Sequence, residues 1–223
     1  MHLRGALIAE FIGTFFLVFA GTGAIIVDSI SHDVTHVGIS LVFGLVIAAL
    51  IYALGHISGA HFNPAVTIAF WALGEFPAPR VPWYVASQLL AAVAASELIR
   101  ALFGMSGGLG VTVPHGAITV SLILEIAMTF LLAFVIFGSA VHGKAVKSFA
   151  GIAIGGTIAL DALFGGPISG ASMNPARSIG PAFASGTWSD QWIYVVGPTL
   201  GALLAVVAYR LMTGIGVKER GPT

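Results

Sequence analysis

Residues 55–65 read GHISGAHFNPA, and residues 166–176 read GPISGASMNPA. Both stretches end in Asn-Pro-Ala and carry Ile-Ser-Gly at the same distance before it. Proline is favoured at the first position of a helix, where its missing N–H costs no hydrogen bond. Asparagine directly before it is a strong cap, because its side-chain oxygen accepts a bond from a free backbone N–H. Each stretch therefore predicts a helix that begins at Asn63 or at Asn174.

The two helices that follow these caps are too short to cross a membrane. Their apolar segments cover residues 63–73 and 174–183, whereas a membrane-spanning helix needs roughly 20 apolar residues. Six longer apolar runs lie around them, at 5–27, 37–54, 81–103, 117–140, 149–164 and 191–212. Short segments in matching places of a chain indicate discontinuous helices that meet near the membrane midplane.

Composition supports a membrane protein. Apolar residues make up 57% of the 223 residues and charged residues only 8%, and the mean hydropathy is +1.00. A soluble domain carries about 25% charged residues, so we expect a lipid bilayer as the solvent. The predicted fold is an all-α membrane protein with six transmembrane helices and two half-helices.

Several partners and chemistries are not expected from this composition. The chain has no cysteine, which excludes disulfides, thiol catalysis and thiolate metal sites. Its formal net charge is zero, which gives no reason to expect nucleic acid as a partner. We also expect no cofactor and no bound metal.

The chain repeats itself beyond the two asparagine motifs. Glu10 lies 53 residues before Asn63, and Glu125 lies 49 residues before Asn174. Three spans per half is an odd number, so the second half must be inverted relative to the first. We expect a single transmembrane channel domain over 1–223, with inverted repeats at approximately 1–110 and 115–223.

Positive charges predict the orientation. Lysine and arginine in short loops favour the cytoplasm, and threading six spans and two half-spans places Arg100 alone at the other face. The residues on the majority side are Arg4, Arg80, Lys144, Lys147, Arg210, Lys218 and Arg220. The sequence thus predicts a multi-pass protein of the cell membrane with both termini in the cytoplasm.

The paired asparagines predict a site for neutral solutes. Each amide group still offers N–H donors once its oxygen caps the helix, and inverted halves would bring these donors together. Both half-helices also direct the positive end of their dipole at this meeting point. Such a centre repels cations and can orient a water molecule so that it does not relay a proton.

Two copies of this motif, placed symmetrically among six spans, resemble the aquaporin (major intrinsic protein) family along the whole chain. The resemblance implies a right-handed bundle with one pore per subunit, assembled as a homotetramer. It implies a passive channel for water and small neutral solutes, and not an enzyme. The short termini and loops suggest a prokaryotic, archaeal-type member.

Arg177 is the main candidate for a selectivity residue. It follows Asn174 by three residues, and a charge at membrane depth costs roughly 2.5–3.5 kcal/mol on insertion scales, so packing alone would not select it. By resemblance, the other positions of the narrow outer filter are Phe43, Ala162 and Ala171.

The filter departs from the pattern of strict water channels. Those channels usually carry histidine where Ala162 falls, so a small apolar residue predicts a wider filter. Glycerol channels usually place aspartate where this chain has Ser178, and a basic residue where it has Ala182. We therefore expect water with some leakage of glycerol or other small neutral solutes. A glycerol-type facilitator is the alternative.

Four further polar residues have competing interpretations. Glu10 and Glu125 lie within spans, and their matching positions predict that each braces a loop by accepting backbone N–H bonds. His61 either lines the pore or braces the first loop. Asp161 precedes Ala162 and is expected to face an outer vestibule or a neighbouring subunit; compensation of Arg177 is the alternative. If Asp161 instead lined the route, an ion-coupled or proton-coupled transporter would become possible.

Overall fold

The computed structural model describes residues 2–143 and 145–214. Six of its helices are long and apolar enough to cross a membrane within these residues. They are α1 (Leu3–Ser31), α2 (Thr35–Ser58), α4 (Val81–Phe103), α5 (Ile118–Ile136), α6 (Ala150–Ser169) and α8 (Ile193–Thr213). Two short helices, α3 (Pro64–Leu73) and α7 (Pro175–Ser185), follow the asparagines. The predicted fold class is therefore confirmed.

Short helical turns complete the chain between the long helices. The turn η1 (Ala78–Arg80) leads into α4, and η2 (Ser106–Gly110) follows it. A π-helical turn, η3 (Phe137–Val141), extends α5, and η4 (Lys147–Phe149) leads into α6. Of these, η2 matters for the site, because its backbone reaches Arg177.

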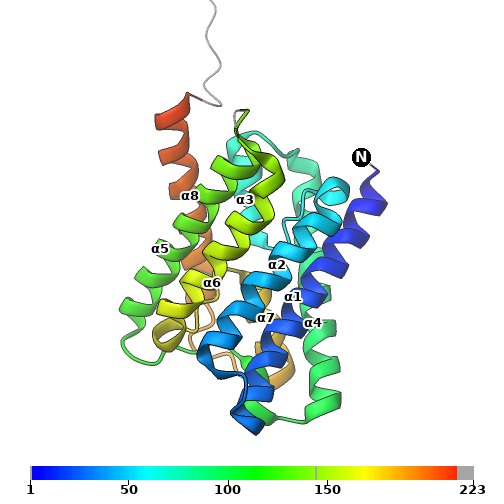
Figure 1. The fold of residues 1–223 in the computed structure, drawn as a ribbon, viewed down its shortest axis with the longest axis vertical. Helices are drawn as coiled ribbons and strands as arrows, with labels where there is room; N and C mark the ends of the chain where they lie inside the picture. Colours follow the sequence, from blue (N-terminus) through cyan, green and yellow to red (C-terminus); the bar gives the residue numbers. More distant parts are fainter. Residues whose placement is uncertain (1, 144, 215–223) are drawn as a thin grey trace, which may run out of the picture.

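The two halves of the bundle run in opposite directions (Figure 1). The N-terminal end of α1 lies at the top of the view, whereas α5 begins at the bottom. The main packing partners are α2 with α6 across the halves, α1 with α4, and α5 with α8. The inversion brings the starts of α3 and α7 into contact inside the bundle.

A pair of glycines sets the approach of α2 to α6. Gly44 and Gly155 occupy equivalent positions, because each lies 19 residues before its asparagine. A Cβ added to Gly44 would lie 2.5 Å from the Gly155 carbonyl oxygen, and one added to Gly155 would lie 2.4 Å from the Gly44 oxygen. Small residues at a crossing let helix backbones approach closely in lipid. The two halves therefore meet backbone to backbone here.

Helix α6 runs further than the apolar pattern predicts. The predicted run ends at residue 164, but the helix continues through Pro167 to Ser169. Proline has no N–H for the carbonyl four residues earlier, and His36 Nε2 lies 2.8 Å from that Leu163 oxygen. A histidine on α2 thus bonds the carbonyl that proline leaves free.

The described lysine and arginine residues of the orientation prediction lie at the ends of the helices that this prediction gives them. Arg4, Arg80 and Lys147 precede or begin α1, α4 and α6, and Arg210 lies in the last turn of α8. All four are at the end where α1 begins, and Arg100 is at the opposite end of α4. The other three residues of the orientation prediction, Lys144, Lys218 and Arg220, lie outside the described residues.

Candidate functional site

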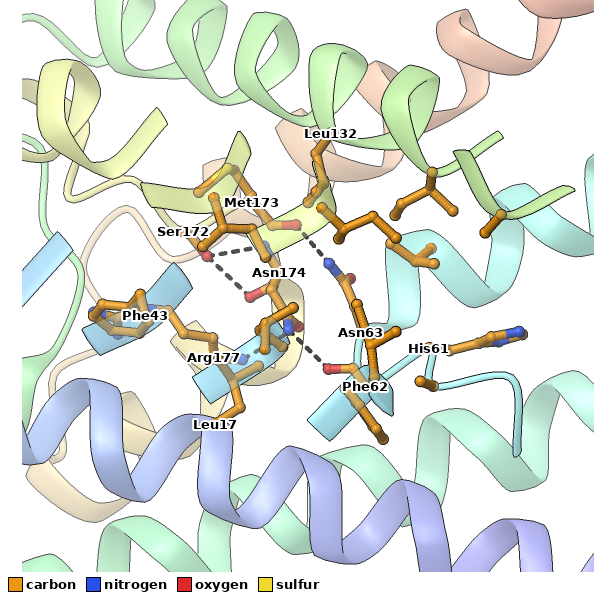
Figure 2. A pocket seen from close by; sticks show the side chains of 18 of the residues that line it. Leu17, Phe43, His61, Phe62, Asn63, Leu132, Ser172, Met173, Asn174 and Arg177 are labelled. Carbon is orange, nitrogen blue, oxygen red and sulfur yellow. Dashed lines mark hydrogen bonds between the residues drawn. The ribbon is translucent and has the colours of Figure 1, made fainter. Parts of the chain in front are cut away.

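The two asparagines cap their helices and bond across the halves. Asn63 Oδ1 accepts from the Ala65 N–H at 2.9 Å, and Asn174 Oδ1 accepts from the Ala176 N–H at 3.0 Å. Asn63 Nδ2 donates to the Met173 oxygen at 2.7 Å, and Asn174 Nδ2 donates to the Phe62 oxygen at 2.8 Å (Figure 2). An amide group carries two N–H bonds, so each asparagine keeps one donor beyond this reciprocal pair.

Glu10 holds the loop before Asn63. This fully buried side chain accepts from the His61 N–H at 2.9 Å and from the Phe62 N–H at 2.7 Å. Gln88 Nε2 donates to the same carboxylate at 2.7 Å. The loop needs such support, because Phe62 has a φ of 49°, in a left-handed backbone region that residues other than glycine rarely adopt.

Glu125 holds the second loop in the same way. It is fully buried and accepts from the Ser172 N–H at 2.9 Å and the Met173 N–H at 2.8 Å. Ser169 Oγ donates a third bond at 2.8 Å. Met173, at φ 53°, has the same left-handed backbone as its counterpart in the first loop. Two matched carboxylates therefore fix the carbonyls that receive the asparagine amides.

Arg177 lies at one end of the site. Its side chain is 3% exposed, and Nη1 donates to the Gly110 oxygen of η2 at 2.8 Å. The guanidinium carbon lies 5.1 Å from the centre of the Phe43 ring, within the range of a cation–π contact. These contacts hold the positively charged guanidinium, with its N–H donors, in the lining of the cavity that Asn174 also lines.

A cavity of about 90 Å³ connects these groups. Its lining includes all four predicted filter residues, Phe43, Ala162, Ala171 and Arg177, together with both asparagines. Leu17, Ile47, Val66 and Leu132 supply apolar wall between the polar groups. Figure 2 shows Phe43 and Arg177 on one side of the asparagines and His61 on the other. The cavity thus has two chemically different ends.

The motif prolines and alanines lie behind this lining. Pro64 and Pro175 are the first residues of α3 and α7, and Ala65 and Ala176 are completely buried. Their role in the geometry is to begin the helices and to leave room for close packing. The pore-facing chemistry comes from the residues around them.

The position of His61 agrees with both interpretations of the sequence analysis, pore lining and bracing of the first loop. It lines the cavity, and its Nδ1 lies 3.1 Å from Thr67 Oγ1. The ring stacks on Phe70 with centroids 4.5 Å apart, and it contacts the rings of Phe76 and Tyr84. The imidazole is therefore held on one side by a hydrogen bond and on its faces by aromatic rings.

The structure corrects the prediction for Asp161. This side chain is 0% exposed and does not line the cavity, so it faces neither an outer vestibule nor the surface of the protomer. It does not compensate Arg177 either, since no ion pair or hydrogen bond joins the two side chains among the described residues. Neither carboxyl oxygen of Asp161 has a hydrogen-bond partner among the described residues. The turn of α6 places it one residue away from the pore-facing Ala162.

Two features of the site escaped the sequence reasoning. The Gly110 carbonyl is set by a run of left-handed residues from 107 to 110, and the glycine-rich GGLG was its only signal. The second is the hydrogen-bonding role of one hydroxyl four residues after each asparagine: Thr67 Oγ1 accepts from Gln88 Nε2, and Ser178 Oγ accepts from Thr112 Oγ1. Their matching position in the two motifs could have revealed them.

The chain is similar to a known protein family and to individual plant proteins. The family model described as Major intrinsic protein matches residues 1–209. Aquaporin NIP1-1 of Zea mays is 48% identical over 208 residues, which cover 92% of this chain and 74% of that protein. Nodulin-26 of Glycine max is also 48% identical, over 92% of this chain and 77% of its own.

The fold is also similar to a solved structure. The X-ray structure of the aquaglyceroporin from Plasmodium falciparum superimposes with a TM-score of 0.82, covering 96% of this chain and 98% of that chain. Its sequence identity is 24%, so this likeness concerns the fold alone. The sequence relatives named above come from plants, and the suggestion of a prokaryotic, archaeal-type chain is therefore not borne out.

Proposed function

Because this chain belongs to the major intrinsic protein family, a family of passive channels and not of enzymes, we propose that it conducts water and small neutral solutes while excluding ions and protons. The family resemblance seen in the sequence is confirmed. The observation that carries the finer proposal is the reciprocal pair of asparagine amides inside a cavity that Arg177 lines at one end.

Ion exclusion is supported by the positive groups around the cavity. The helices α3 and α7 begin at the asparagines and direct their positive dipole ends toward the same region. Arg177 adds a full positive charge, held in place by the Gly110 carbonyl. A cation that enters would lose hydration beside these groups, whereas a neutral molecule is not repelled and can accept hydrogen bonds from their N–H donors.

Proton exclusion is supported by the remaining asparagine donors. A water oxygen that accepts from both amides has its hydrogens directed away along the pore. This water cannot pass a proton through its own lone pairs at that point, because the lone pairs are engaged. The surrounding apolar wall, which includes Val66 and Leu132, offers few other partners.

The filter residues support a solute range wider than water. Phe43 and Arg177 are bulky and in contact, whereas Ala162 and Ala171 contribute only a methyl group each to the lining. A glycerol-type facilitator is therefore the second candidate function. We propose water as the main permeant, with glycerol or molecules of similar size passing more slowly.

The proposal extends to assembly and location. We propose a homotetramer in the cell membrane, with one pore in each subunit. The charge placement of Arg4, Arg80, Lys147 and Arg210 at one end supports cytoplasmic termini by the positive-inside rule. The many exposed apolar side chains of the single chain, such as Leu45 and Leu211, would face lipid or neighbouring subunits.

Reconstituted liposomes provide the test. The purified protein is followed by stopped-flow light scattering under a sucrose gradient and then under a glycerol gradient, with empty liposomes as the control. We expect fast water flow and slower glycerol uptake. Glycerol uptake as fast as water flow would favour the facilitator, and no flux above the control would contradict the open pore.

Two additions sharpen this test. Ala162→His should narrow the filter and lower glycerol uptake at least fivefold while water flow persists. A proton gradient should leave the wild-type flux unchanged. A flux that follows the gradient would instead indicate a coupled transporter.

A further inference from the structure

The hydrogen bonds around Thr67 determine which nitrogen of His61 carries the proton. Thr67 Oγ1 lies 3.0 Å from the Asn63 oxygen, to which it donates, and it accepts from Gln88 Nε2 at 3.0 Å. His61 Nδ1 lies 3.1 Å from the same hydroxyl. The hydroxyl has one hydrogen and two lone pairs. Because Thr67 donates its hydrogen to the Asn63 oxygen, its hydroxyl can only accept from His61. The His61 ring must therefore donate through Nδ1–H.

The opposite tautomer makes fewer hydrogen bonds. If Nδ1 accepted instead, Thr67 would turn its hydrogen to His61 and lose the bond to the Asn63 oxygen. Since the hydroxyl bonds all three neighbours only when Nδ1 is the donor, this arrangement is favoured. A neutral imidazole protonated at Nδ1 presents Nε2 as a hydrogen-bond acceptor.

Nε2 is open to the cavity. Nε2 has no hydrogen-bond partner among the described residues, yet it is not one of their buried unpaired atoms, so it has accessible surface. Gly59 keeps this face open, because a Cβ there would lie 3.3 Å from Nε2. Stacking on Phe70 and the edge contact with Phe76 prevent the ring from turning away.

The opposite end of the cavity presents the reverse polarity. Arg177 and the two asparagines offer N–H donors, and His61 lies beyond the asparagines from Arg177 (Figure 2). A solute that leaves the asparagine donors toward this end meets a lone pair. It can therefore bond there only through its own O–H or N–H group.

We propose that His61 Nε2 is an acceptor subsite that selects for small neutral solutes with O–H or N–H donors, such as amides and polyols, over donor-free solutes of similar size. This inference rests on the proposed channel function and adds the chemical class that the pore favours. The role belongs to His61 itself, and Thr67 is the positioning residue that fixes the tautomer.

The test compares urea with dimethyl sulfoxide in proteoliposomes. The two molecules have the same number of heavy atoms, and only urea carries N–H donors. The measured quantity is the ratio of their permeabilities after subtraction of empty-liposome leakage. His61→Phe keeps an aromatic ring but removes the acceptor, and one lost neutral hydrogen bond corresponds to roughly a three- to tenfold effect. We expect the urea permeability and the ratio to fall by that factor.

Three further variants separate acceptor chemistry from shape. His61→Gln offers a side-chain amide oxygen at a similar reach and should restore at least half of the ratio. Thr67→Val leaves the ring in place but frees Nδ1, so the ratio should fall by a smaller factor. His56→Phe is the matched control, because His56 is exposed and outside the cavity, and it should leave the ratio unchanged.

The outcomes distinguish this inference from the proposed function. Equal losses of urea and dimethyl sulfoxide flux in His61→Phe would show a steric effect and overturn the acceptor subsite. An unchanged ratio in both His61→Phe and Thr67→Val, with normal water flow, would overturn it as well. If liposomes with the wild-type protein passed water and urea no faster than empty liposomes, the proposed channel function itself would be contradicted.

Discussion

The two halves of the molecule share a frame and differ in what they present to the pore. Each half has a buried glutamate that accepts two backbone N–H bonds of a loop, and each has a tyrosine whose hydroxyl donates to the serine carbonyl before that loop. The tyrosines are Tyr84, which bonds Ser58 at 2.9 Å, and Tyr194, which bonds Ser169 at 2.6 Å. The reciprocal asparagine bonds also match, at 2.7 and 2.8 Å.

The pore-facing positions do not follow this equivalence. Three residues after its asparagine, the first half has Val66 and the second has Arg177. Two residues before it, the first half has His61 and the second has Ser172. The groups that satisfy the strained loops are thus the same in both halves, because losing a glutamate leaves buried N–H groups unpaired and losing a tyrosine hydroxyl leaves a carbonyl without that donor. The residues that contact solute are free to diverge, and they give the pore a donor end and an acceptor end.

The largest effect should come from removing either brace. Glu10→Leu and Glu125→Leu each leave two buried backbone N–H groups without an acceptor, at about 1–3 kcal/mol for each unpaired group. We expect each variant to lose about 2–6 kcal/mol of stability by this reasoning, seen as a much lower thermal unfolding midpoint in detergent. If only one variant were affected, the frame would not be equivalent in the two halves.

The next effect should come from exchanging the pore residues between halves. Arg177→Val copies the first half and removes the charge, so glycerol uptake should rise roughly tenfold, a barrier change of about 1.4 kcal/mol. A potassium leak should appear with it. Both fluxes are measured in liposomes. Unchanged glycerol and ion fluxes would contradict a filter role for Arg177.

The reverse exchange provides the matched experiment. Val66 is 4% exposed and lines the same cavity, so Val66→Arg should place a second large cation in the pore. Water flow should fall by about a factor of ten or more, on the same arithmetic. Full water flow in a correctly folded Val66→Arg protein would mean that this position does not reach the pore.

The smallest effect should come from Asp161. Its counterpart in the first half is Leu50, since each lies 13 residues before its asparagine. A buried carboxyl without a partner is unfavourable, so Asp161→Leu should stabilise the protein by about 1 kcal/mol, which a thermal unfolding midpoint in detergent can detect. Asp161→Asn, which keeps the shape, should change the midpoint less. A lower midpoint in both variants would reveal a stabilising contact of Asp161.

Much of the fold was predictable because its signals are local. The asparagine caps, the apolar runs and the matched glutamates follow from single residues and their spacing, and the filter positions follow from family resemblance. The end of α6 was not predictable in this way: Pro167 stays in the helix because His36, on another helix, bonds the freed carbonyl. The burial of Asp161 was missed for a related reason, since one residue of helical rotation decides whether α6 directs a side chain into the pore or into the protein.

The crossed asparagine bonds also have a consequence for biosynthesis. The Asn63 amide bonds to Met173, which lies 110 residues later in the chain. At synthesis rates of about 5–20 residues per second, roughly 6–22 seconds pass on the ribosome before that partner exists. During this interval the first half-helix has no second half to dock against. The nascent first half must therefore remain incomplete, held by the translocon, by lipid or by water, until the last third of the chain arrives.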